Sequence, residues 1–172
     1  MNRRALIALV GDRRGTAAAE MALIAPLLLI LGFGSIETGN FFLDQHTLEK
    51  AVRDGARFAA RQSFSSYPTC SGSPDTTSVV TPTQNVVMYG YLNGTNALTP
   101  NIIASDITVS TQCFTSAVGG QTMSGLYKNR TNGAQVVTVT AAVPYRTVVS
   151  SFGIRASAWQ LNATSQAAVT GI

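Results

Sequence analysis

The feature that most constrains this chain is an uncharged, mostly apolar run at residues 21–36, MALIAPLLLILGFGSI. Together with residues 16–20, it is long enough as a helix to cross the ~30 Å hydrocarbon layer of a bilayer. Four arginines precede the run, and few basic residues follow it directly. Because positive charge favours the cytoplasmic side, we expect residues 1–15 to form a cytoplasmic leader and the C-terminal part to be exported. The sequence therefore predicts a single-pass protein of the inner membrane.

The run fits either a cleaved secretory signal or a membrane helix that stays in the mature protein, and Glu20 bears on the choice between them. An ordinary secretory signal is cut after small residues. Gly32-Phe33-Gly34 offers such a site, and the mature chain would then begin near Ser35. Glu20 argues against this alternative, since an ionisable residue in a membrane segment is costly and points to a function. The simpler interpretation of Glu20 is a carboxylate near the interface, stabilised by the helix dipole.

The apolar periodicity continues past the membrane run. Apolar residues recur at helical spacing, at Phe41, Leu48, Val52, Ala56 and Ala59. A second face is charged at intervals of four residues, at Glu49, Arg53, Arg57 and Arg61. We therefore predict one helix from about residue 17 to about residue 62, with Pro26 and several glycines weakening it. Residues 37–62 would form its exported amphipathic half, with Glu49 and Arg53 as a favourable pair on a solvated charged face.

Several motifs lie at fixed spacings in this region: Arg13-Arg14-Gly15, Glu20, Ala25-Pro26, Ile36-Glu37 and Val52-Arg53-Asp54-Gly55-Ala56-Arg57. In combination they resemble the N-terminus of TadE-like proteins, the minor pilins or pseudopilins of the tight adherence (Flp, type IVc) pilus system. The resemblance implies that a prepilin peptidase cuts between Gly15 and Thr16. It also implies that Glu20 is an assembly residue. Met21 departs from the family, which commonly has an aromatic residue there.

The remainder, residues 63–172, is predicted to be an exported β-rich domain. Ser, Thr, Pro and Gly dominate residues 63–82, which favours a loop. A short helix at residues 83–92, closed by Asn93-Gly94, would follow. Alternating and β-branched residues then predict strands at residues 102–114, 135–145 and 156–168. We expect an antiparallel sheet of three or four strands packed on the exported half of the helix, a pilin-like α+β fold.

The two cysteines, Cys70 and Cys113, stand far apart in the sequence. In an exported domain such a pair predicts a disulfide, and two unpaired buried thiols are the alternative. No metal site is expected, because two cysteines and one histidine do not complete a four-ligand zinc site. No cofactor is implied either.

The distribution of positive charge and the lack of catalytic motifs argue against two classes of function. Three of the four net positive charges lie in residues 1–15, so the C-terminal part lacks the basic surface of a nucleic-acid-binding protein. The sequence also lacks a nucleophile elbow, a phosphate-binding glycine loop and a HExxH motif. We assign His46 to a surface or packing role and Trp159 to a core or an interface, and nothing marks Asp75 and Asp106 as a catalytic pair. We therefore do not expect an enzyme.

The predicted function is that of a minor pilin or pseudopilin in the assembly or adhesion of a tight adherence pilus. Its partners would be other pilin subunits, the assembly platform, a prepilin peptidase and membrane lipid. The alternative is an exported or membrane-anchored binding module, such as an adhesin, outside any pilus. The two differ in the mature N-terminus, Thr16 in the first case and about Ser35 in the second.

Overall fold

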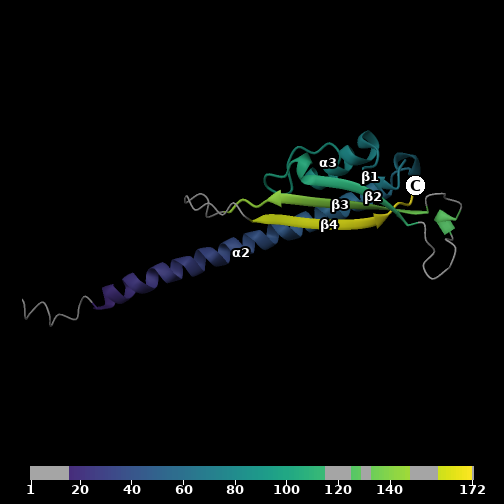
Figure 1. Ribbon diagram of the computed structural model, residues 1–172. Helices are drawn as coiled ribbons and strands as arrows, with labels where there is room; N and C mark the ends of the chain where they lie inside the picture. Colours follow the sequence, from purple (N-terminus) through teal and green to yellow (C-terminus); the bar gives the residue numbers. More distant parts are fainter. Residues whose placement is uncertain (1–15, 115–124, 129–132, 148–158, 172) are drawn as a thin grey trace, which may run out of the picture. The chain divides into compact units, whose positions relative to one another are not determined.

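The computed structural model describes residues 16–114, 125–128, 133–147 and 159–171 (Figure 1). The chain divides into two compact units, Met1–Gly39 and Asn40–Ile172, which we call unit 1 and unit 2. The boundary falls inside the long helix α2, Thr16–Ala60, so unit 2 begins with the part of this helix from Asn40 onwards. The predicted leader at residues 1–15, including Gly15, lies outside the described residues.

Helix α2 confirms the predicted long helix and ends two residues before the expected position. The last carbonyl groups of a helix have no partner within it, and here two later segments supply donors. The Tyr67 hydroxyl donates to the Ala59 carbonyl. The backbone N–H and the hydroxyl of Thr170 both donate to the Ala60 carbonyl, at 2.7 and 3.2 Å. Burial raises the pKa of the Tyr67 hydroxyl, so it remains a neutral donor.

The predicted loop at residues 63–82 contains short elements that periodicity does not reveal. They are a 3-10 turn, a two-residue strand and a π-helical turn: η2 (Phe64–Ser66), β1 (Ser71–Gly72) and η3 (Thr76–Val80). Asp75 begins the π-helical turn, because its carboxylate accepts hydrogen bonds from the N–H and the hydroxyl of Ser78, both at 2.7 Å. A side-chain acceptor at this position satisfies a donor that the first turn leaves free.

Helix α3 (Thr81–Tyr89) confirms the predicted short helix but is displaced towards the N-terminus. It continues directly from the π-helical turn, so it begins before residue 83. It stops at Gly90, whose φ of 81° lies in the left-handed region that glycine adopts without strain. The expected end at Asn93-Gly94 is therefore wrong, because Gly90 has already ended the helix.

The sheet has four antiparallel strands in the order β1-β2-β3-β4. The three long strands are β2 (Ile107–Phe114), β3 (Ala134–Pro144) and β4 (Gln160–Ala168). Figure 1 shows β3 between β2 and β4, with α3 close to β2. The expected antiparallel sheet is confirmed, and β1 supplies the fourth strand, which was not predicted individually.

Strand β3 is shifted by one residue from the prediction, and the starts of the other two long strands differ by several residues. Residues 102–106 do not pair, because Ala104–Asp106 form a 3-10 turn in which the Asp106 carboxylate accepts a hydrogen bond from the Ile103 N–H at 3.0 Å. The third predicted strand begins at Gln160 rather than near residue 156, and residues 156–158 lie outside the described part.

The core of unit 2 lies between the C-terminal part of α2, α3 and one face of the sheet. Strand β3 alternates strictly, with Val137, Val139, Ala141 and Val143 fully buried. Of the helix residues in the predicted apolar stripe, Leu48, Val52, Ala56 and Ala59 are buried and Phe41 is half-buried. The helical spacing of apolar residues in α2 and the alternation in β3 therefore account for these two parts of the core. The structure confirms the mixed α+β class.

The disulfide between Cys70 and Cys113 is present, and the two Cα atoms are 4.8 Å apart. Cys70 directly precedes β1, and Cys113 lies near the end of β2. The Cys113 N–H also donates to the Cys70 carbonyl at 3.2 Å. The covalent bond therefore fixes the short strand β1 to the edge of the sheet. Closing a loop of this length, with a sequence separation of 43, stabilises a domain by about 4 kcal/mol at most.

Candidate functional site

The first described turn of α2 carries the residues that the sequence assigned to processing and assembly. Thr16 is the first helical residue, and Glu20 lies one helical turn later with its side chain exposed. Four residues of helix rise about 6 Å and make slightly more than one turn, so the two positions lie on the same side of the helix. Gly15, the other half of the expected cleavage site, lies outside the described residues. Cleavage after Gly15 and the assembly role of Glu20 therefore stay predictions.

The apolar run that follows Glu20 is exposed on every side of the helix. Leu23 and Ile30 are 80% and 70% exposed, and the remaining large apolar side chains from Met21 to Ile36 are also exposed. An 18-residue window of α2 reaches a mean hydropathy of 2.0, and none of it is buried. A helix that is apolar all round requires an apolar environment. This part of α2 is therefore a candidate single-pass membrane anchor.

Two hydroxyl groups near the end of this run already have partners within the helix. The Ser35 hydroxyl donates to the Leu31 carbonyl, and the Thr38 hydroxyl donates to the Gly34 carbonyl, each at 2.8 Å. A buried polar group that lacks a hydrogen bond is costly in hydrocarbon. These internal bonds lower the cost of placing both residues in or near a bilayer.

Unit 2 carries the charged face of α2 predicted from the sequence. Arg53, Arg57 and Arg61 are exposed. Arg57 approaches the Asp54 carboxylate at 3.8 Å. Glu49 accepts a hydrogen bond from Gln45 at 3.0 Å and lies 3.9 Å from His46, one turn earlier, so its contacts differ from the expected pair with Arg53. Exposed pairs of this kind contribute little to stability, and the face is a solvated surface as expected.

Gly55, within the motif that carried the resemblance, lies where α2 and α3 pack closely together. A Cβ atom at this position would overlap a methyl group of Val87 and would contact Thr83. Val52 and Ala56, on either side of Gly55 in the motif, are buried in the core. The small residue therefore allows two helices of unit 2 to pack closely, which the sequence alone did not show.

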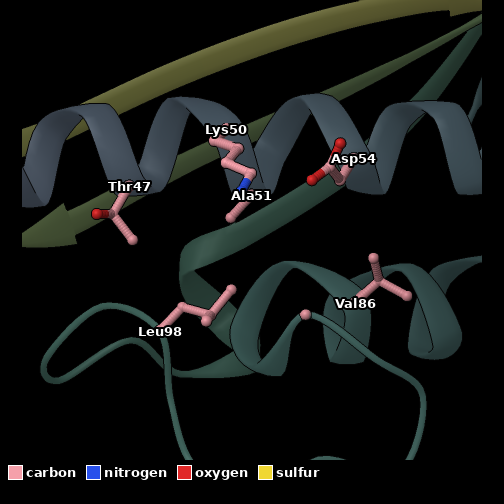
Figure 2. A pocket seen from close by; sticks show the side chains of 7 residues that line it. Thr47, Lys50, Ala51, Asp54, Val86 and Leu98 are labelled. Carbon is pink, nitrogen blue, oxygen red and sulfur yellow. The ribbon is translucent and has the colours of Figure 1, made fainter.

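Beside this crossing, a cavity of about 330 Å³ opens between α2, α3 and the loop after α3 (Figure 2). Its lining combines one cation, one carboxylate and an apolar wall: Thr47, Lys50, Ala51, Asp54, Val86, Gly90 and Leu98. The Thr47 hydroxyl donates to the Leu43 carbonyl at 2.9 Å, so it is already engaged. The lining residues include no group of three His, Cys, Asp or Glu side chains that could hold a metal ion. Sequence reasoning missed this cavity because it depends on how the two helices cross.

The remaining residues singled out from the sequence have local structural roles. Asp75 and Asp106 each accept a hydrogen bond from the backbone of their own turn. The hydrogen bonds from Ser78 lower the pKa of the Asp75 carboxyl. The His46 side chain is 77% exposed. Among the described residues there is no group of three or more His, Cys, Asp or Glu side chains that could hold a metal ion.

These features define a class of protein: a small α+β unit joined to a candidate membrane anchor by one long helix. Residues 15–57 match the family model of TadE-like proteins, which confirms the resemblance seen in the sequence and connects the chain with Tad pilus systems. The match ends within α2, so it covers neither α3 nor the sheet. No curated protein and no solved structure matches the chain.

Proposed function

We propose that the chain is a minor pilin or pseudopilin of a tight adherence pilus and that its role is structural and not enzymatic. The observation that carries the proposal is Glu20, an exposed carboxylate at the start of an exposed apolar helix, within the segment that matches the TadE-like model. The arginines at residues 3, 4, 13 and 14 support an N-terminus in the cytoplasm and an exported unit 2.

The proposed mechanism begins with cleavage between Gly15 and Thr16 by a prepilin peptidase. Cleavage creates an ammonium group at Thr16, one helical turn before the Glu20 carboxylate. In a bundle of such helices, the carboxylate of one subunit meets the ammonium of its neighbour. Each isolated charge is costly near hydrocarbon, so the pairing removes both costs and also fixes the axial register of the two helices.

The test is to replace Glu20 with Gln or Ala and to measure co-purification with other pilus components. Both variants should reach the membrane with unit 2 folded and the disulfide formed, yet fail to enter pilus complexes. Glu49→Gln is the matched control, because Glu49 is an exposed carboxylate on the same helix but in unit 2. Unchanged co-purification of both Glu20 variants would contradict the assembly role.

A second measurement addresses the alternative of a signal-exported or anchored binding module. Mass spectrometry of the membrane-extracted protein should find an N-terminus at Thr16. An N-terminus near Ser35 would instead favour the secretory signal, because cleavage there would remove Glu20 and most of the apolar run.

A further inference from the structure

Unit 2 contains a cluster of aromatic side chains close to its first residue. Phe41 contacts Tyr145 and Trp159 edge to face, with ring centroids 5.2 and 5.8 Å apart, and Tyr145 stacks on Trp159. Phe42 contacts Phe41 in the same manner at 6.0 Å. We call these four residues together with Leu43 the aromatic patch.

The sheet and the helix build this patch together. The Tyr145 N–H donates to the Trp159 carbonyl at 2.9 Å, which holds the two residues side by side just beyond the paired ends of β3 and β4. Both rings then contact Phe41 of α2. Residues more than one hundred positions apart in the sequence therefore meet at one end of unit 2.

Much of the patch remains exposed. Phe42 is 56% exposed, Leu43 66% and Trp159 48%, although Tyr145 is buried. Exposed large apolar groups gathered in one place indicate a surface that contacts something else. The positions of these side chains around the helix help to distinguish a protein partner from a bilayer. Three successive helix positions point about 100° apart, so Phe41 faces Tyr145 and Trp159 while Phe42 and Leu43 point to other sides of α2 and are exposed.

Exposed apolar groups on more than one side of a helix suit an environment that the helix enters. A protein partner usually docks on one face, whereas a bilayer can contact several sides of a helix at once. Trp and Tyr are moreover the residues that favour the boundary between acyl chains and headgroups, because each combines an apolar ring with a polar group. The chemistry of the patch therefore fits a membrane interface.

The position of the patch along α2 fits the same environment. The exposed apolar run ends at Ile36, and Phe41 follows five residues later in the same helix. Five helical residues rise about 7.5 Å, while the headgroup layer adds about 5–8 Å to each side of the hydrocarbon. If residues 16–36 fill the hydrocarbon, the few residues between Ile36 and Phe41 keep Phe41 close to the bilayer surface, whatever the relative orientation of the two units.

The polar groups next to the patch are compatible with a position near the lipid headgroups. Arg146, adjacent to Tyr145, is exposed and can approach lipid phosphates. Asp44 is the acidic neighbour of Leu43, and burial raises the pKa of its carboxyl, which lowers the cost of losing its charge near lipid.

We propose that the aromatic patch docks unit 2 on the lipid interface, with Trp159 inserted at the boundary between headgroups and acyl chains. The proposal relies on α2 as a membrane anchor and goes beyond the proposed role in a pilus. It also adds a function for Trp159, which would report the contact directly because it is the single tryptophan in the sequence.

The experiment uses the purified full-length protein in phosphatidylcholine vesicles and measures Trp159 fluorescence. Lipids brominated near the headgroup should quench the emission strongly relative to unbrominated lipids, and lipids brominated near the chain end should quench it less. The double variant Phe42→Ser/Leu43→Ser should lose much of this quenching. Phe114→Ser is the control, because Phe114 is also an exposed aromatic residue, at 50%, but pairs with Ala134 at the opposite end of β3.

The outcomes separate the alternatives without requiring pilus components. Equal emission in brominated and unbrominated vesicles would overturn the proposal, as would stronger quenching from the chain end than from the headgroup side. Protection of Trp159 from aqueous iodide without quenching by brominated lipid would also overturn it, and would indicate contact with a second copy of the chain. The wild-type measurement involves no substitution, so it decides the question even if a variant fails to fold.

Discussion

The two units of this chain differ in where their apolar side chains lie. In the described part of unit 1, residues 16–39, large apolar side chains such as Leu23 and Ile30 are exposed. In unit 2, Leu48 and Val139 are fully buried between helix and sheet. Both units share the same helix, α2, and the helix changes its role within a few residues of Gly39.

This difference shows that one helix can serve two environments when its apolar pattern changes. An apolar surface on all sides calls for lipid or other helices, whereas a stripe on one face is satisfied by the protein's own sheet. Substitutions in unit 1 should therefore alter association with a membrane or with other subunits. Substitutions in unit 2 should alter the free energy of unfolding.

The largest expected effect is a difference in the free energy of unfolding between substitutions at two leucines of α2. Leu48→Ala removes a fully buried side chain and should destabilise unit 2 by about 2–5 kcal/mol, because it leaves a cavity as well as losing apolar burial. Leu28→Ala removes a side chain that is 56% exposed and should leave the unfolding of unit 2 unchanged. Denaturant unfolding of both variants in mild detergent, followed by near-ultraviolet circular dichroism, checks this. Equal destabilisation by both substitutions would abolish the distinction between the units.

A smaller difference in stability is expected between substitutions at two glycines of the same helix. Gly55→Ala places a methyl group against Val87 and should cost about 1–3 kcal/mol, since the close packing of α2 and α3 must relax. A Cβ atom at Gly39 would meet no other atom within 4 Å, so Gly39→Ala should not destabilise unit 2. Thermal unfolding in detergent gives the comparison. If Gly55→Ala lowered the thermal stability no more than Gly39→Ala does, the description of α2 and α3 as closely packed at Gly55 would be contradicted.

The smallest effect concerns charge at the surface of unit 2. The pKa of Asp75 is lowered in the folded protein, so its carboxylate stabilises the fold above the ordinary carboxyl pKa of about 3.9. This stabilisation is lost as the pH falls from that value through the lowered pKa. Asp75→Asn keeps a capping acceptor but removes the charge. Its melting temperature should fall slightly below that of the wild type at pH 7, and the gap should close in acid. A gap that widened in acid would contradict the role of the charge.

The sequence determined those features that rest on local periodicity and composition. The uncharged run at residues 21–36 indicated the candidate anchor, and the helical spacing of Leu48, Val52 and Ala56 indicated the buried stripe of unit 2. Alternation predicted a strand at residues 135–145, and β3 buries one of its two faces. The order of the motifs around Glu20 and Gly55 was also sufficient to find the family resemblance. Each of these signals lies within a single element, so it can be found without knowing which distant residues it contacts.

Other features were decided only when distant segments came together. The end of α2 depends on donors from Tyr67 and Thr170, the tight crossing at Gly55 depends on Val87, and the aromatic patch depends on Tyr145 and Trp159. No local pattern specifies these contacts, because each joins residues from elements that pair only in the folded chain. Side-chain packing and hydrogen-bond satisfaction act between neighbours in space, so the tertiary structure alone determined them.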